Sequence, residues 1–69
     1  MARAYYQNKK GILKSLNETD HEGNRTETPI EFRNAKAARN FLISHLKAYQ
    51  FTEGEVIDDD GKRTIVKLA

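Results

Sequence analysis

The stretch from Asn34 to Tyr49 shows the clearest hydrophobic periodicity in the chain. On a helical wheel, Lys36, Asn40 and Lys47 fall on one side. The opposite side is a continuous arc of Ala35, Ala38, Phe41, Leu42, His45, Leu46 and Tyr49. This pattern predicts an amphipathic helix with a wide apolar face, capped by Asn34 and favoured at its C-terminal end by Lys47. Such a helix is marginal alone and needs a surface to pack on.

The segments before the helix show strand patterns. Residues 2–7 and 12–17 are expected to be extended, with a turn or bulge between Asn8 and Gly11. Either these segments form a tight hairpin or they are one long strand bent at Gly11. Residues 25–32 alternate between polar positions and Thr26, Thr28, Ile30 and Phe32, which predicts a strand with one buried face. Pro29 cannot donate to a ladder, which favours an edge position or an outward-pointing backbone there.

The last fifteen residues predict a β-hairpin, reached through a connection at residues 50–54. Two runs rich in β-branched residues flank Asp58-Asp59-Asp60-Gly61, and Asp-Gly is a strong hairpin signal. If Asp60 and Gly61 are the two loop residues, Asp59 faces Lys62 and Asp58 faces Arg63. A three-residue loop shifts the register by one and exchanges which of Val56 and Ile57 faces the helix.

Together these segments predict one α+β domain over residues 1–69. Its antiparallel sheet has four to five strands, and one amphipathic helix packs on one face in a ββαββ order. The expected core is Ile12, Leu16, Ile30, Phe32, Ala38, Phe41, Leu42, Leu46, Tyr49, Phe51, one of Val56 or Ile57, Val66 and Leu68. A chain of 69 residues buries only about 60% of its unfolded surface, so its core is small. A homodimer would enlarge this core but is not required, so we expect a monomer or a homodimer.

Charged residues are grouped by segment. Residues 1–16 contain four bases and no acid, residues 17–32 contain five acids and one base, and residues 33–50 contain four bases. Residues 51–61 then contain five acids and residues 62–69 three bases, for a net charge of +2. Such segregation marks a binding face, or the blocks neutralise one another across neighbouring strands.

Cysteine content and hydropathy give the expected location. The chain has no cysteine, which is typical of the reducing cytoplasm. No apolar run approaches the roughly 18–20 residues of a membrane span, and no signal-peptide pattern opens the chain. We therefore expect a cytoplasmic protein with no membrane partner.

The residues that carry chemistry do not form a catalytic pattern. There are two histidines and two serines, and Ser44 and His45 are adjacent on a helix, where neighbouring side chains point about 100° apart. Aligning Gly61 with the sixth position of a calcium loop places Val56 first and Lys67 twelfth, and neither is a ligand. We expect no catalytic residue, no metal and no cofactor.

A nucleic-acid interface is a candidate in the first strands. Basic and aromatic residues are interleaved within this short stretch, as in grooves that bind single strands: Arg3, Tyr5, Tyr6, Lys9, Lys10 and Lys14. The alternative is that the two tyrosines supply core and the bases only solvate the surface. DNA or RNA is thus a second class of candidate partner.

Residues 30–66 resemble small phage and prophage accessory proteins, including some type I anti-CRISPR proteins. The resemblance lies in Ile30-Glu31-Phe32-Arg33-Asn34-Ala35-Lys36-Ala37-Ala38, in Val56-Ile57-Asp58 and in Asp60-Gly61-Lys62-Arg63. It implies a non-enzymatic inhibitor that occludes a surface of a host protein or nucleoprotein complex. On this hypothesis the partner-binding residues are Arg33, Lys36, Asn40 and Lys47.

Overall fold

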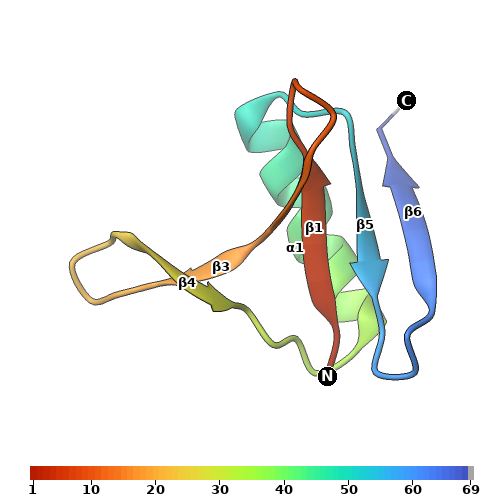
Figure 1. The fold of residues 1–69 in the computed structure, drawn as a ribbon, viewed down its shortest axis with the longest axis horizontal. Helices are drawn as coiled ribbons and strands as arrows, with labels where there is room; N and C mark the ends of the chain where they lie inside the picture. The colour runs from red at the N-terminus through yellow and green to blue at the C-terminus, as the bar shows by residue number, and fades with distance from the viewer. Residues whose placement is uncertain (69) are drawn as a thin grey trace.

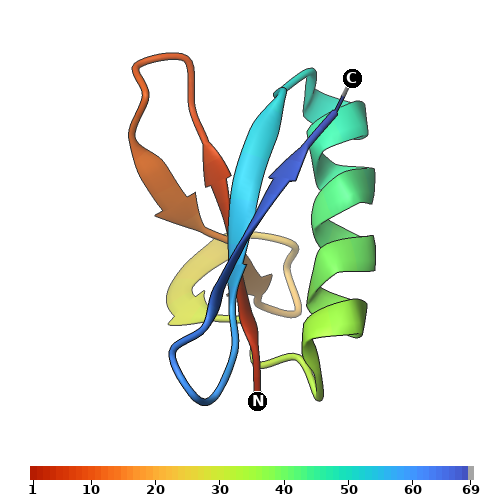
Figure 2. The same ribbon diagram turned by 90° about the vertical axis from the view of Figure 1, so that its right-hand side faces the viewer.

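One helix packs on one face of a four-stranded antiparallel sheet, and a separate two-stranded arm extends from it (Figures 1 and 2). The computed structural model describes residues 1–68, so Ala69 of the expected hairpin lies outside the described residues. The strand order is β2-β1-β5-β6 in the main sheet and β3-β4 in the arm. The α+β prediction is confirmed. The elements are β1 (Arg3–Gln7), β2 (Leu13–Ser15), β3 (Asn17–Thr19), β4 (Arg25–Pro29), α1 (Ala35–Tyr49), β5 (Glu53–Ile57) and β6 (Arg63–Lys67).

The helix begins and ends as its sequence predicts. The Asn34 side chain accepts a hydrogen bond of 2.8 Å from the Ala37 backbone N–H, which satisfies one of the free donors of the first turn. At the other end Gln50 adopts a left-handed conformation with φ of 61°, and its N–H bonds to the Leu46 carbonyl. Lys47 lies in the last turn.

The core lies between α1 and the main sheet. Ala38, Leu42 and Leu46 of the helix are fully buried, and they pack toward a sheet face that carries Ala4 and Val56 as paired neighbours. Ala4 of β1 lets the helix approach closely, because an alanine leaves room for the leucines above it. Each buried leucine contributes about 1.5–3 kcal/mol relative to exposure. The remaining buried apolar residues are Ala2, Leu16 and Val66.

The same three-residue loop closes all three hairpins. Each loop follows the pattern Asx-x-x-Gly, and the Gly N–H bonds to the carbonyl of the Asx at 2.9–3.0 Å. The glycines adopt φ values of 80° to 84°, a conformation that suits a type I turn followed by a glycine bulge. The three loops are Asn8–Gly11, Asp20–Gly23 and Asp58–Gly61.

These loops decide the alternatives that the sequence left open. Residues 2–7 and the following segment form a hairpin rather than one bent strand, since Tyr6 pairs with Lys14. The two-residue loop at Asp60-Gly61 is wrong, because Ile57 pairs with Arg63 and the Asp58 N–H donates to the Lys62 carbonyl. The three-residue register places Val56 toward the helix, where it is 2% exposed.

Two of the three carboxylates of the last loop, those of Asp58 and Asp60, accept hydrogen bonds within the loop itself. Asp58 Oδ1 accepts from the Asp59 N–H at 2.8 Å, and Asp60 Oδ1 accepts from the Lys62 N–H at 3.0 Å. Asp59 pairs with the N-terminal ammonium of Met1. Turn chemistry therefore accounts for Asp58 and Asp60 of this acidic run, and the ion pair with the N-terminus accounts for Asp59.

The expected strand over residues 12–17 is divided at Leu16. The Leu16 N–H donates to Ala4 of β1, whereas its carbonyl accepts from the Ile30 N–H beyond β4. The chain thus changes sheets at this residue, whose side chain is 1% exposed. Likewise β4 ends at Pro29, so the expected strand over 25–32 is too long, and Phe32 only bridges to Ala2. The expected connection at 50–54 is also too long, because β5 begins at Glu53.

Three expected core residues are wrong. Ile12 is 53% exposed, Phe41 44% and Tyr49 59%. Ile12 directly follows the Asn8–Gly11 loop, and Phe41 lies at the rim of an apolar arc that is wider than the narrow sheet can cover. Tyr49 lies near the middle of this arc, but it is the last residue of α1 and so lies at the very end of the helix. Within residues 1–68, α1 falls short of the length and apolar character needed to cross a bilayer.

Candidate functional site

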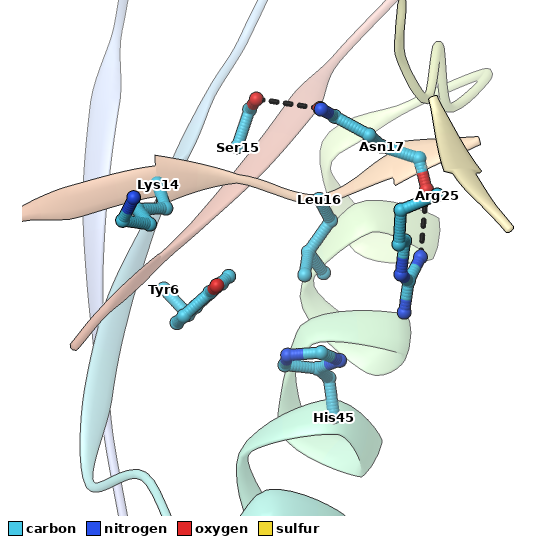
Figure 3. A pocket seen from close by; sticks show the side chains of 7 residues that line it. All are labelled: Tyr6, Lys14, Ser15, Leu16, Asn17, Arg25 and His45. Atoms are coloured by element: carbon cyan, nitrogen blue, oxygen red, sulfur yellow. Dashed lines mark hydrogen bonds between the residues drawn. The ribbon is translucent and has the colours of Figure 1, made fainter. Parts of the chain in front are cut away.

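Two adjoining cavities lie where the β1–β2 hairpin meets the C-terminal half of α1. The first, of about 380 Å³, is lined by Tyr6, Lys14, Ser15, Leu16, Asn17, Arg25 and His45 (Figure 3). The second, of about 490 Å³, is lined by Asn8, Lys9, Lys10, Ile12, Lys14, Tyr49 and Phe51. Because Lys14 lines both, we treat them as one feature and call it the basic groove.

Strand register and the bend at Leu16 assemble the first cavity. Tyr6 pairs with Lys14, so both side chains lie on the helix side of the sheet. The bend then turns β3 away from β2 and brings the arm to the cavity edge. There, Arg25 Nη1 donates to the Asn17 carbonyl at 2.7 Å, and Figure 3 shows the guanidinium extending toward His45.

Hydrogen bonds hold Asn17 in this cavity wall. Its Oδ1 accepts from the Ser15 hydroxyl at 2.6 Å, and its Nδ2 donates to the Thr26 carbonyl at 2.9 Å. The side chain therefore links β2, β3 and β4 at the point where the chain changes sheets. This linkage fixes the Arg25 anchor relative to Lys14.

Every charged residue that lines the groove is basic. Lys9, Lys10, Lys14 and Arg25 line it, and no lining residue is acidic. The three ion pairs found within residues 1–68 lie elsewhere, at Met1–Asp59, Arg3–Glu31 and Arg63–Glu55. The four groove bases thus present their charge to solvent or to a bound anion.

His45 is electrostatically coupled to the groove. Burial lowers the pKa of His45, and the positive charge of Arg25 lowers it further. Both effects favour the neutral imidazole. A bound anion would act in the opposite direction, because a negative charge beside the ring stabilises the imidazolium.

Four rings form a continuous aromatic cluster along the groove. Tyr6 stacks on Phe51 with ring centroids 4.8 Å apart, and Tyr6 contacts His45 at 5.0 Å. The His45 ring in turn lies against the ring of Tyr49, which is one helical turn further along α1, with centroids 4.6 Å apart. Offset and tilted contacts at these distances are favourable between aromatic rings. The cluster connects the two cavities, since each is lined by two of its members.

The structure separates the nucleic-acid residues named from the sequence into two groups. Tyr6, Lys9, Lys10 and Lys14 line the basic groove. Strand alternation directs Arg3 and Tyr5 to the sheet face opposite the helix. Arg3 Nη2 lies 2.6 Å from Glu31 Oε1, and this hydrogen-bonded carboxylate raises the pKa of Arg3.

The residues named for a protein partner lie on the helix and just before it. Arg33, Lys36, Asn40 and Lys47 are all exposed. Within the helix, Lys36, Asn40 and Lys47 fall within an arc of about 40° on a wheel of 100° per residue. They face away from the sheet and line neither cavity.

No known protein family, curated protein or solved structure matches this chain. Function is therefore inferred from the geometry of the groove. Ser15 and His45 line the same cavity, but the Ser15 hydroxyl donates to Asn17, and no hydrogen bond joins it to His45 within residues 1–68. Such an arrangement does not activate a nucleophile, whereas the free bases and rings suit binding.

Among the charged and aromatic residues of the groove, sequence reasoning missed one cation and three rings: Arg25, His45, Tyr49 and Phe51. The spacing of His45 and Tyr49 by four residues places them on one helix face, so that pair had a sequence signal. Their place in the apolar arc of the helix, which is expected to face the core, concealed it. Arg25 and Phe51 carried no such signal, because their positions depend on the bend at Leu16 and on the end of the helix.

Proposed function

We propose that this protein binds nucleic acid through the basic groove, without catalysing a reaction on it. One observation carries the proposal: four bases and no acid line two adjoining cavities, and no ion pair neutralises these bases within residues 1–68. Phosphate backbones are recognised by such unneutralised clusters, because binding releases condensed counterions. The aromatic cluster beside the bases is the second element of such grooves.

The groove has the dimensions of a ligand-binding feature. Its two cavities of about 380 and 490 Å³ each lie in the size range of small-ligand sites, roughly 300–1,000 Å³. Lys14 lies at their junction, so a chain of phosphates that passes it meets Arg25 on one side and Lys9 and Lys10 on the other. Affinity is expected to be sequence-independent, because these contacts are to phosphates.

A salt titration tests the proposal. Anisotropy of a fluorescein-labelled oligonucleotide should report binding at 50 mM salt and a loss of about 50-fold in affinity by 200 mM, for four phosphate contacts to a single strand. Lys14→Gln should weaken binding and reduce the salt slope by about 0.7. The matched control is Lys67→Gln, an exposed lysine of β6 on the sheet face opposite the groove.

Two results would contradict the proposal. The first is no binding of any oligonucleotide at 50 mM salt. The second is an equal effect of Lys14→Gln and Lys67→Gln, which would place binding on the diffuse surface charge rather than in the groove.

A second candidate function is surface occlusion of a host protein or nucleoprotein complex, as the phage-protein resemblance suggests. It is favoured by the composition of α1, which has no acidic residue and exposes Lys36, Asn40 and Lys47 in one row. The double variant Lys36→Glu with Lys47→Glu should then abolish co-purification of a host complex, and Lys14→Gln should preserve it. The reverse pattern would assign the interaction to the groove.

A further inference from the structure

Two of the exposed large apolar side chains lie together in the second cavity. Tyr49 is 59% exposed and Ile12 is 53% exposed, and both line the cavity that also carries Lys9 and Lys10. Phe51 also lines this cavity and stacks on Tyr6. An exposed ring beside lysines suits a nucleotide, because the planar base can stack on the ring while the phosphate contacts the lysine ammonium groups.

The aromatic cluster holds Tyr49 in place. The centroid of the Tyr49 ring lies 4.6 Å from that of the His45 ring. The His45 ring lies in turn against the Tyr6 ring, which stacks on Phe51. A ring supported in this way loses little freedom on binding, which favours affinity. The first cavity offers no equally exposed ring, and its cations are Lys14 and Arg25. The two cavities therefore differ in chemistry.

We infer that the ligand is a single strand of nucleic acid, with one base stacked on Tyr49 in the second cavity and the adjacent phosphates along Lys14 and Arg25. This inference rests on the proposed function and specifies its ligand. A duplex keeps its base faces inside its own stack, so only an unpaired base can present its face to Tyr49. Every base has such a face, so stacking does not select a sequence.

The test compares three labelled probes with the full-length protein: a ten-nucleotide thymidine strand, an abasic strand of the same length and a ten-base-pair duplex. One stacked base should make the thymidine strand bind at least about fivefold more tightly than the abasic strand. Tyr49→Ala should remove this advantage, so that the thymidine and abasic strands bind with equal affinity. Tyr49→Phe, the matched control, should keep it.

The abasic strand also controls for folding, because salt-dependent binding of this strand shows that the Tyr49→Ala variant retains the groove bases in place. Equal binding of all three probes, or equal loss on both strands in Tyr49→Ala, would overturn the inference while leaving phosphate binding in the groove intact. Absence of binding to every probe at low salt would overturn the proposed function, and this inference with it.

Discussion

Gly54 is the residue whose replacement should disturb this fold most for the smallest change in volume. A Cβ at this position would lie 2.2 Å from the Tyr5 carbonyl oxygen, 3.1 Å from Tyr6 Cα and 3.2 Å from Leu42 Cδ1. Two of these neighbours are backbone atoms of β1, so they cannot rotate away. Gly54 therefore sets the approach of β5 to β1 beneath the helix.

The magnitude follows from these distances. An ordinary contact needs roughly 3.5 Å, so about 1 Å of separation must be created between paired strands in Gly54→Ala. Overpacking of this kind costs about 1–3 kcal/mol, and the backbone contact places the variant at the upper end, near 3 kcal/mol. A domain of this size is stabilised by only about 3–10 kcal/mol in total. Movement of Tyr6 should also displace the aromatic cluster.

Urea unfolding followed by far-UV circular dichroism measures this loss. With a slope of about 1 kcal/mol/M, the midpoint of Gly54→Ala should fall by roughly 3 M, or the variant should be unfolded in buffer. The matched control is Gly23→Ala, where a Cβ meets nothing within 4 Å and only the positive φ of 84° is strained. That change should cost about 1–2 kcal/mol. Equal midpoints for the two variants would refute the proposed close approach.

Three further predictions concern the helix and its histidine. Asn34→Ala should lower the free energy of unfolding by about 1 kcal/mol through loss of the cap, as read from the urea midpoint. Leu46→Ala, at a fully buried position, should cost about 2–5 kcal/mol, whereas Phe41→Ala, at a position 44% exposed, should cost less than half as much in the same assay. Because burial and Arg25 lower the pKa of His45, the unfolded chain binds the proton more readily. The contribution of His45 to the free energy of unfolding should therefore be complete above about pH 6.5 and should fall as the pH decreases below this value. In urea unfolding at a series of pH values, the midpoint of His45→Gln should lack this pH-dependent contribution.

The helix and the sheet class could be predicted because their signals are local. The apolar arc of α1, the Asn34 cap and the β-branched runs of β5 and β6 each lie within a short window. Their packing then follows, since an amphipathic helix has few other surfaces on which to bury Leu42 and Leu46.

The hairpin registers had a sequence signal that the dipeptide Asp-Gly obscured. Each of the three loops places Asn or Asp three residues before Gly, and this recurrence favours a three-residue loop over a two-residue one. In the first two loops the Asx side chain accepts two backbone N–H groups, as when Asn8 Oδ1 bonds to both Lys10 and Ile12. The first residue of the pattern, not the residue before Gly, thus sets the register.

The groove could be predicted only in part. Tyr6 and Lys14 meet across one hairpin, and Lys9 and Lys10 lie in its loop, so their proximity is a local consequence of the chain. Arg25 reaches them only because Leu16 leaves one sheet for the other. Nothing in the spacing of residues 12–17 marks that change of sheet.

The structure also separates the two interpretations of the segregated charge. Neutralisation between blocks occurs at Arg3–Glu31 and Arg63–Glu55, on or beside the sheet face that the helix leaves open. The other three bases of the N-terminal block lie in the groove and have no acidic partner there. The tip of the arm, which carries Asp20 and Glu22, projects away from the main sheet (Figure 1). Under the proposed function, the acidic arm tip repels a polyanion and the groove attracts it, so segregated charge directs the approach of the ligand although the net charge is only +2.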